Sequence, residues 1–223
     1  MSERQLVVTE DGSHSFFVPS LDEHYHSHHG AIQESNHVFI EKGLKRVSDG
    51  KDFVRILEVG FGTGLNALLT ALEAVGRGLE VEYWTLEAFP LTKEELAALN
   101  YAELMPGARA AEIWGALHLA AWGEMVSLCP EFRIHKMNVK VQEAILPVCF
   151  DLIYFDAFAP EKQPELWTGS IFEKMWDLTS ENGILTTYCA KGSVRRSMVA
   201  AGFKVERTNG PPGKREMLIA MKD

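Results

Sequence analysis

The sequence is short of cysteine and contains no long apolar run. Its three cysteines, Cys129, Cys149 and Cys189, lie far apart, so neither a disulfide framework nor a CxxC metal-binding pair is expected. No stretch reaches the roughly 18 apolar residues that a membrane span requires. The first residues, MSERQLVVTEDG, also lack the basic and then apolar order of a secretion signal. We therefore expect a cytoplasmic protein with no membrane segment.

Positive charge is also scarce. The chain has 22 Lys and Arg against 31 Asp and Glu, a formal net charge of −9. This balance argues against a protein that coats nucleic acid non-specifically, because neutralising phosphates requires a surplus of cations. The cations that are present gather late in the chain, at Lys191, Arg195, Arg196, Lys204, Arg207, Lys214 and Arg215. This cluster could form either a local basic face that binds nucleic acid or an ordinary solvated face.

The alternation of short β-branched or aromatic runs with longer amphipathic stretches predicts β-α-β units around a parallel sheet. With 223 residues, one globular unit is expected: residues 51–223 form the core domain, and residues 1–50 form an N-terminal extension or lid packed on it. Helical spacing occurs at Leu65–Val75, Thr92–Leu99, Ile171–Leu178 and Ser193–Ala201. Thr92, with Glu95 three residues later, predicts a capping box. Seven strands are expected, at Arg55–Val59, Val81–Leu86, Phe132–His135, Phe150–Phe155, Gly183–Tyr188, Lys204–Thr208 and Glu216–Ala220.

The connection between the last two expected strands is too short for a helical crossover, so these strands should pair antiparallel. A seven-stranded, mostly parallel, Rossmann-like α/β sheet with an antiparallel last strand is the usual layout of class I S-adenosylmethionine-dependent methyltransferases. The first expected strand leads into the sequence ILEVGFGTGLN, residues 56–66, which has glycines at 60, 62 and 64.

The spacing of these glycines distinguishes between nucleotide cofactors. The dinucleotide fingerprint G-x-G-x-x-G needs a third glycine where this chain has Leu65, and no G-K-[ST] follows to form a phosphate loop. A G-x-G-x-G turn led by Glu58 is instead typical of methyltransferases, with the acid near the charged amino-acid end of the cofactor. The alternative is a plain strand-to-helix turn.

Acidic residues follow two further strands, where ligands of doubly wound sheets bind. Glu87 is placed to accept both hydroxyls of a ribose, a feature that NAD enzymes share. Asp156 should face the site of methyl transfer and take the proton that an amine must lose before it attacks. The alternative for Asp156 is a helix cap. Phe158 and Pro160 would give this pocket an apolar wall.

The motifs resemble one family in particular. ILEVGFGTGLN, LEAFPL, FDAFAPEKQPELWT, YCAKGSVRR, AGF and GKREML occur in this order in the methyltransferase module of the MnmC family. These bacterial enzymes complete 5-methylaminomethyl-2-thiouridine at the tRNA wobble position. The resemblance runs from about residue 22 to residue 217. It includes the segment YHSHHGAIQESNHVF, with matching positions at Tyr25, Gly30, Glu34, Ser35, Val38 and Phe39.

The resemblance implies methyl transfer from S-adenosylmethionine to the aminomethyl nitrogen of 5-aminomethyl-(2-thio)uridine in the anticodon loop of tRNA. It places Asp156 at the reacting amine. Trp167 would be either a stacking platform for an exposed base or a core residue. Around the cofactor, the resemblance places Glu58, Gly60, Gly62, Gly64, Asn66 and Glu87. On the substrate side, it places Tyr25, Glu34, Phe158, Pro160, Lys162, Trp167, Lys214 and Arg215.

The chain departs from the family pattern in two ways. It has Met137-Asn138 where the family has Gly-Asp near the adenine, so Asn138 would hydrogen-bond the adenine amino group through its amide. Longer members carry a C-terminal flavin-dependent oxidase domain, whereas this chain stops after the last strand. The oxidase step is therefore not expected, and the chain would need a substrate that already bears a free aminomethyl group, or a separate enzyme that makes one.

A run of histidines suggests two roles. No cysteine or suitably spaced carboxylate completes a metal set, so we expect no metal. Alternatively, the run lies over the mouth of the site, with His24 or His37 near phosphate, and strengthens RNA binding in mild acid. The run consists of His24, His26, His28, His29 and His37. In the expected helix after AKGS, Ser193 would be the N-cap, and Arg195 and Arg196 would either contact phosphate or lie on a solvated face.

Two rival functions remain open. One is methylation of a small-molecule amine or a protein, which the acidic net charge favours. The other is a non-catalytic scaffold that binds S-adenosylmethionine, which the presence of Glu58, Glu87 and Asp156 disfavours. The basic turn at residues 213–215 and the basic end of the chain favour RNA over small amines.

Overall fold

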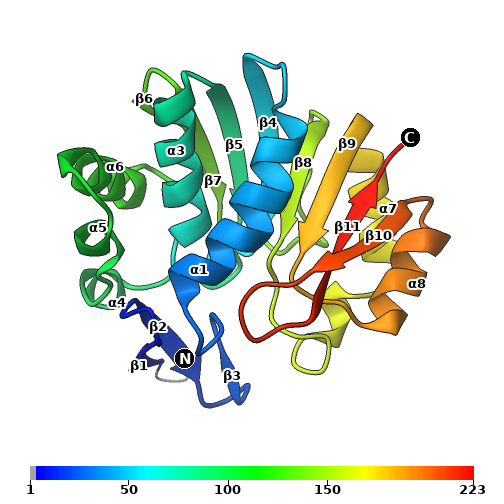
Figure 1. Ribbon diagram of the computed structural model, residues 1–223, viewed down its shortest axis with the longest axis horizontal. Helices are drawn as coiled ribbons and strands as arrows, with labels where there is room; N and C mark the ends of the chain where they lie inside the picture. The colour runs from blue at the N-terminus through cyan, green and yellow to red at the C-terminus, as the bar shows by residue number, and fades with distance from the viewer. Residues whose placement is uncertain (1–3) are drawn as a thin grey trace.

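The computed structural model describes residues 4–223, and its central feature is an eight-stranded sheet (Figure 1). The strands lie in the order β10-β11-β9-β8-β4-β5-β7-β6. Strands β9, β8, β4, β5 and β7 are parallel, whereas β11 pairs antiparallel with both β9 and β10. The bounds are β4 Phe53–Val59, β5 Glu80–Leu86, β6 Met125–Cys129, β7 Phe132–Met137, β8 Phe150–Phe155, β9 Thr179–Thr187, β10 Lys204–Asn209 and β11 Glu216–Met221.

All seven expected strands are present, and the antiparallel last strand is confirmed. The expectation of seven strands was wrong by one, because β6 adds an eighth at the edge next to β7. Every residue of β6 is at least partly exposed, and its pairing with β7 shifts register between Ser127 and Cys129. An edge strand without a buried face lacks the apolar alternation by which strands are identified in a sequence.

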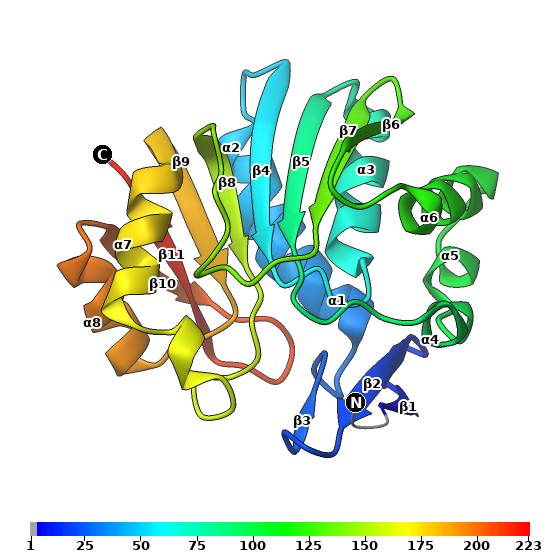
Figure 2. The same ribbon diagram turned by 180° about the vertical axis from the view of Figure 1, so that it is seen from behind.

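Helices cover both faces of the sheet, as a comparison of Figures 1 and 2 shows. One face is covered by α3, Leu65–Arg77, and by a continuous helical run of α1, Ala31–Ser35, the π-helix η1, Asn36–Leu44, and α2, Lys45–Val47. The other face is covered by α7, Gly169–Leu178, and α8, Gly192–Ala200. The remaining helices are α4 Lys93–Ala97, α5 Tyr101–Leu104, α6 Ala108–Leu119 and the 3-10 helix η2 Pro164–Leu166.

The two faces of β4 bury different residues. Ile56 belongs to the apolar core beneath α3, whereas Leu57 and Val59 belong to the core beneath α7. Side chains alternate between faces along a strand, so Glu58 points with Ile56 toward α3. The sequence of β4 is apolar on both faces apart from Arg55 and Glu58, as expected for a central parallel strand.

The N-terminal segment forms a second, three-stranded antiparallel sheet of β1 Gln5–Val8, β2 His14–Val18 and β3 Glu23–His24. This sheet lies beyond the carboxyl ends of the parallel strands (Figures 1 and 2). Arg4 pairs with Glu95 at 2.9 Å, and the His14 ring nitrogen Nδ1 lies 2.6 Å from the carbonyl of Ala98. These contacts hold the sheet against the region around α4. Residues 31–47 pack within the main core, to which Phe16 of β2 also contributes.

Two predictions about helix ends had different outcomes. Thr92 and Glu95 form the expected capping box at the start of α4. Ser193 is not an N-cap, because α8 begins earlier and its N-cap position is Lys191. Within residues 4–223, no helix combines the length and apolar character needed to cross a bilayer.

Candidate functional site

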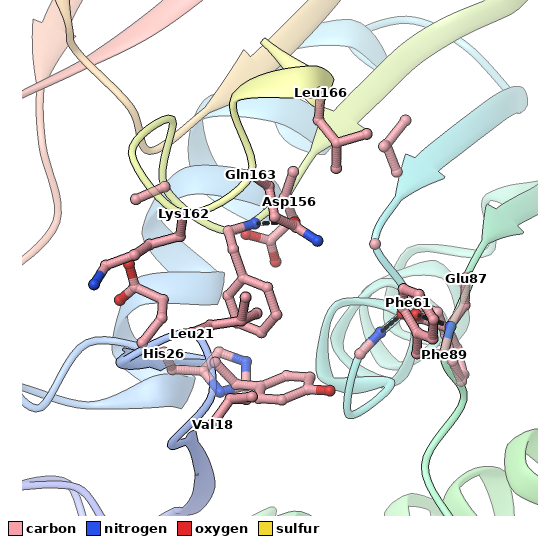
Figure 3. A pocket seen from close by; sticks show the side chains of 18 of the residues that line it. Val18, Leu21, His26, Phe61, Glu87, Phe89, Asp156, Lys162, Gln163 and Leu166 are labelled. Atoms are coloured by element: carbon pink, nitrogen blue, oxygen red, sulfur yellow. Dashed lines mark hydrogen bonds between the residues drawn. The ribbon is translucent and has the colours of Figure 1, made fainter. Parts of the chain in front are cut away.

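A cavity of about 1230 Å³ opens at the carboxyl ends of the parallel strands. Its walls are the glycine turn after β4, the loop after β5, the loop after β8 and the N-terminal segment. Figure 3 shows Asp156 and Glu87 on opposite sides of this space, with Val18 and His26 of the N-terminal segment on a third side. Ligands of open α/β sheets bind at this position.

The glycine turn is held in a conformation that side chains would block. Gly60, Gly62 and Gly64 all have positive φ angles, of 95°, 51° and 81°. A Cβ on Gly60 would lie 2.5 Å from the carbonyl oxygen of Asp156, and a Cβ on Gly62 would lie 3.1 Å from the Tyr25 ring. The turn therefore presents bare backbone to the cavity, which permits a ligand to approach closely.

Glu87 is anchored beside this turn. Its Oε2 accepts a hydrogen bond from the Gly62 backbone N–H at 2.9 Å, and its Oε1 accepts one from the Phe89 N–H at 2.8 Å. Each carboxylate oxygen keeps a second lone pair. The carboxylate is thus fixed in orientation at the cavity wall and can still accept hydroxyl groups, as the predicted ribose contact requires.

Asp156 follows β8, and its backbone N–H donates to the Val59 carbonyl at 3.0 Å. The Asn66 side chain, which lies in the first turn of α3, donates from Nδ2 to Asp156 Oδ2 at 2.8 Å. Burial raises the pKa of Asp156 to about 7, and the Asn66 hydrogen bond only partly opposes this shift. The carboxyl group can therefore exchange a proton near neutral pH, which suits a general base.

A charged pair joins two distant parts of the chain at the cavity. Lys214 Nζ lies 2.5 Å from Glu34 Oε1 and 3.9 Å from the centroid of the Tyr188 ring. The Ser27 N–H also donates to Glu34 at 2.8 Å. Glu34 and Lys214 act on Asp156 in opposite directions, because the Glu34 charge raises its pKa and the Lys214 charge lowers it. Both residues were expected on the substrate side, but their pairing was not predicted.

Aromatic side chains form the wall next to Asp156. The rings of Tyr25 and Phe158 meet edge to face at 5.0 Å, and the Tyr188 hydroxyl donates to the Ala157 carbonyl at 2.8 Å. Trp167 is only 6% exposed, and its Nε1 donates to the Phe158 carbonyl at 2.8 Å. Trp167 is therefore a core residue that supports the loop, and it is not exposed for base stacking. Pro160 is partly exposed in the same loop but does not line the cavity.

Glu58 does not reach the cavity, contrary to its expected place beside the cofactor. It is fully buried on the α3 side of β4, where the Thr85 hydroxyl donates to its Oε2 at 2.7 Å. Burial raises the pKa of Glu58 well above its usual range. Two features explain its position. Side chains alternate between the faces of a strand, so Glu58 lies on the face beneath α3. It also lies before the tip of β4, and only residues at the tip can face the cavity.

Asn138 also differs from expectation. Its side chain is exposed, and its Nδ2 donates to the backbone carbonyls of Glu87 at 2.8 Å and Ala88 at 3.3 Å. It does not line the cavity, where residues 139–143 take part instead. Asn138 therefore holds the loop that carries Glu87, and the structure does not place its amide for an adenine.

The cations expected near RNA fall into two groups. Lys162 lines the cavity and pairs with Asp22 at 3.1 Å, and Lys191 pairs with Glu161. Arg215 does not line the cavity. It is exposed beside the cavity-lining Lys214 and makes no ion pair with any described residue. Arg195 and Arg196 of α8 are also exposed, and neither makes an ion pair with any described residue.

The histidine run does not form a single cluster. The rings of His24 and His28 meet at 4.1 Å, whereas the His37 Nε2 contacts the Asn209 carbonyl at 2.8 Å. Burial lowers the pKa of His24, and it lowers that of His26 to about 4. His26 therefore stays neutral in mild acid, which removes it from the predicted pH effect on RNA binding. Among residues 4–223, no three His, Cys, Asp or Glu side chains gather to hold a metal ion.

Several cavity residues were not expected from the sequence. Phe89 is 62% exposed at the rim, and the carboxamide of Gln163 accepts a hydrogen bond from the Phe158 N–H. The Nδ1 of His26 lies 2.9 Å from the Ser15 hydroxyl, and Tyr188 carries the Lys214 contact. Phe89 and Tyr188 lie within the motifs LEAFPL and YCAKGSVRR, so their position just after a strand was an available signal.

The residues of the cavity fit S-adenosylmethionine. The bare backbone of the glycine turn and the fixed Glu87 carboxylate suit a nucleoside. The cavity volume of about 1230 Å³ leaves room for a cofactor of this size. Asp156 lies across the cavity from Glu87 (Figure 3). The site can therefore hold a nucleoside cofactor on one side and a proton-donating substrate group on the other.

Comparison with known proteins agrees with this description. A model of S-adenosyl-L-methionine-dependent methyltransferases matches residues 120–223. The bifunctional protein MnmC of Aromatoleum aromaticum, named for tRNA 5-methylaminomethyl-2-thiouridine biosynthesis, is 30% identical over 96% of this chain and 34% of its own length. MnmC of Paracidovorax citrulli is 33% identical over 93% of this chain and 34% of its own. The chain thus spans about a third of the length of these curated relatives.

Solved structures with a similar fold were also found. The crystal structure of MnmC2 from Aquifex aeolicus superposes with a TM-score of 0.80 at 28% identity, covering 99% of this chain and 70% of that one. Spermidine synthase from Thermotoga maritima shares the fold, with a TM-score of 0.58 at 14% identity over 98% of this chain and 72% of its own. The chain is thus similar, over nearly its whole length, to the methyltransferase part of MnmC proteins, and its residues 120–223 match a model of S-adenosyl-L-methionine-dependent methyltransferases.

Proposed function

We propose that this protein transfers a methyl group from S-adenosylmethionine to the aminomethyl nitrogen of 5-aminomethyl-(2-thio)uridine at the wobble position of tRNA. The observation that carries the proposal is the place of Asp156 in the cavity. Its carboxyl group follows β8, is oriented by Asn66 at 2.8 Å, and has a pKa raised to about 7. The tRNA substrate is proposed on the names of the MnmC relatives.

The proposed reaction needs an amine with a free lone pair. S-adenosylmethionine supplies a methyl group on a sulfonium and leaves as the corresponding thioether. As the N–CH₃ bond forms and the S–CH₃ bond breaks, the amine must give up one proton. Asp156 accepts this proton, directly or through a water molecule, and its near-neutral pKa makes the transfer efficient at physiological pH.

The other cavity residues bind and orient. Glu87 is placed for the ribose hydroxyls, and the glycine turn leaves room for the amino-acid end of the cofactor. Tyr25 and Phe158 form an apolar wall that keeps water from the reacting amine. Arg215, Arg195 and Arg196 provide exposed positive charge for tRNA phosphates. The N-terminal sheet, residues 4–30, acts as a lid over the site.

A second candidate is methylation of a small amine. One observation favours it: Lys162 and Lys214, which the resemblance placed on the substrate side, and Lys191 of the basic end of the chain are each paired with a carboxylate. These pairs reduce the positive potential at the cavity mouth. The two candidates predict different substrates for the same catalytic groups.

A methyl-transfer assay with radiolabelled S-adenosylmethionine distinguishes the candidates. The substrates are tRNA from cells that lack the modification, the same tRNA treated with ribonuclease, and a panel of primary amines. We expect label in intact tRNA, mapping to the wobble nucleoside. Label only in small amines would replace the proposal with the second candidate. Cofactor binding without any transfer would indicate a non-catalytic scaffold.

The proposed reaction requires a tRNA that already carries the free aminomethyl group. We propose that a separate enzyme supplies it, and a test is whether tRNA bearing the carboxymethylaminomethyl group is methylated. The expected result is no transfer to that tRNA until another enzyme has exposed the amine.

A further inference from the structure

The ammonium group of Lys214 fills a small site in the cavity wall. Its Nζ lies 2.5 Å from Glu34 Oε1 and 3.9 Å from the centroid of the Tyr188 ring. Proteins bind alkylammonium ions through carboxylates and through the faces of aromatic rings, and both groups are present here. All three residues line the cavity. The position of Lys214 therefore marks a site whose chemistry suits a primary ammonium group.

Both parts of this site are held in place by groups other than Lys214. The Ser27 N–H donates to Glu34 Oε2 at 2.8 Å, and Glu34 is only 7% exposed. The Tyr188 hydroxyl donates at 2.8 Å to the backbone carbonyl of the residue after Asp156, which fixes the ring beside that loop. A carboxylate buried to this extent is costly without a cation beside it. The site is thus preorganised for a cation, whichever group supplies it.

The site lies in the same part of the cavity as the proposed proton acceptor. The charges of Glu34 and Lys214 both act on the pKa of Asp156, and the charges of Glu34 and Asp156 both act on the pKa of Tyr188. Charges interact in this way only over short distances in a protein. An amine bound at Glu34 would therefore be close to the carboxylate that takes its proton.

Lys214 reaches this site from a hairpin turn. Residues 210–215 join β10 to β11, and the turn extends toward α1 and the N-terminal segment (Figure 1). Gly213 has a φ of 82°, and a Cβ at this position would overlap the His29 ring. The Lys214 N–H donates to the Pro211 carbonyl at 2.9 Å, a bond within the turn itself. The turn can thus withdraw from the cavity while β10 and β11 stay paired.

We propose that Glu34 and Tyr188 form the binding site for the primary ammonium group of the methyl acceptor, and that Lys214 occupies this site until the acceptor displaces it. Lys214 and an aminomethyl group are chemically equivalent there, because both end in CH₂–NH₃⁺. The inference names the residues that bind the acceptor amine, so it rests on the proposed function. Since Lys214 competes with the acceptor, the apparent affinity is reduced to the fraction of molecules whose site is open.

Binding of the nucleoside 5-aminomethyluridine tests the inference without methyl transfer. The protein is saturated with S-adenosylhomocysteine, which has no methyl group to give, and 5-methyluridine is the probe that lacks the amine. Lys214→Met keeps a long side chain but removes the ammonium, so calorimetry should show about tenfold tighter binding of 5-aminomethyluridine. Glu34→Gln/Lys214→Met also removes the carboxylate and should lose this gain. Binding of 5-methyluridine should be the same in all of these proteins.

Lys140→Met is the matched control. Lys140 is exposed and also lines the cavity, so this change removes the same charge from the same cavity but leaves Lys214 on Glu34. It should change the affinity for 5-aminomethyluridine little. Equal gains in Lys140→Met and Lys214→Met would indicate a general charge effect and overturn the inference. Unchanged or weaker binding by folded Lys214→Met would show that Lys214 is a permanent part of the site, which also overturns it.

NMR of the unmodified protein gives a second test that does not depend on the folding of Lys214→Met. With lysine labelled with ¹³C at Cε, the Lys214 resonance should lie upfield, because its ammonium is over the face of the Tyr188 ring. Lys214→Arg assigns this resonance. Saturating 5-aminomethyluridine should move it to the position of a solvated lysine, whereas 5-methyluridine should not. A resonance that stays upfield with the amine bound, or no binding that depends on the amine, would overturn the inference.

Failure of this inference can be distinguished from failure of the proposed function. If 5-aminomethyluridine displaces Lys214 but no tRNA is methylated, the proposed function fails and the ammonium site stands. If tRNA is methylated but Lys214→Met does not bind the amine more tightly, the ammonium site fails and the proposed function stands.

Discussion

Lys214 of the C-terminal hairpin turn and Glu34 of the N-terminal helical run form an ion pair with 2.5 Å between Nζ and Oε1. The pair joins residues 180 positions apart and lies at the cavity near Asp156. Lys214 is therefore a structural and electrostatic part of the site, in addition to any contact it makes with RNA. Its partner Glu34 is 7% exposed, so the pair cannot be broken without leaving a buried charge.

The first prediction concerns the stability of this pair. Lys214→Met should lower the free energy of unfolding by about 1 to 3 kcal/mol, below the range for a fully buried pair because the Lys214 side chain is 33% exposed. Urea unfolding measures the loss. The matched control is Lys191→Met, whose partner Glu161 is exposed, and it should change stability by less than about 1 kcal/mol. The double variant Glu34→Gln/Lys214→Met should recover most of the loss, and no recovery would contradict the role of the pair.

The second prediction concerns catalysis by Asp156. Asp156→Asn removes the proton acceptor but preserves the shape of the site. We expect kcat to fall by about 10² to 10⁴, with cofactor affinity within several-fold of the original value. In the unmodified protein, kcat should rise with pH through about 7, because only the ionised carboxylate accepts a proton. Asp177→Asn, at an exposed position of α7, is the control for loss of a negative charge. Undiminished turnover in Asp156→Asn would remove this residue from the mechanism.

The third prediction concerns the effect of pH on stability. The pKa of Asp156 is about 7 in the folded protein and near 3.8 in the unfolded chain. The folded state therefore binds more protons between these values, and the contribution of Asp156 to stability falls as pH rises from about 4 to 7. Unfolding in urea at several pH values, compared with Asp156→Asn, isolates this contribution, which is on the order of 4 kcal/mol. A stability difference between the two proteins that does not vary with pH would show that the pKa is not raised.

The fourth prediction concerns RNA binding. Arg215→Glu should weaken tRNA binding several-fold to tenfold and reduce its salt dependence, because the exposed guanidinium adds positive charge beside the cavity. Fluorescence anisotropy at several salt concentrations measures both effects. Lys204→Glu is the control, since it lies at the opposite end of the same hairpin and should have little effect. Equal losses in the two variants would indicate a general charge effect with no local RNA surface.

Much of the fold could be predicted because its signals are local. The seven strands and the glycine turn were recognised from short apolar runs and glycine spacing, and each is present. The positions of Glu87 and Asp156 followed from one rule, that ligands bind beyond the carboxyl ends of parallel strands. Both residues line the cavity, on opposite sides of it.

The rest depends on relationships that a linear sequence does not display. Glu58 is only two residues before the glycine turn, yet strand alternation buries it beneath α3. The pairing of Glu34 with Lys214 needs both ends of the chain to meet at the cavity. The sequence left Trp167 open as a stacking platform or a core residue, and its indole is buried and donates to the Phe158 carbonyl.

The contact between Gly60 and Asp156 has a consequence for how variants of this protein are interpreted. A Cβ at position 60 would lie 2.5 Å from the Asp156 carbonyl oxygen, so any side chain there pushes on the backbone that carries the carboxyl proposed as the proton acceptor. Substitution of Gly60 would therefore slow the chemical step even where the purpose was only to weaken cofactor binding. Saturating the enzyme with cofactor would not restore its rate.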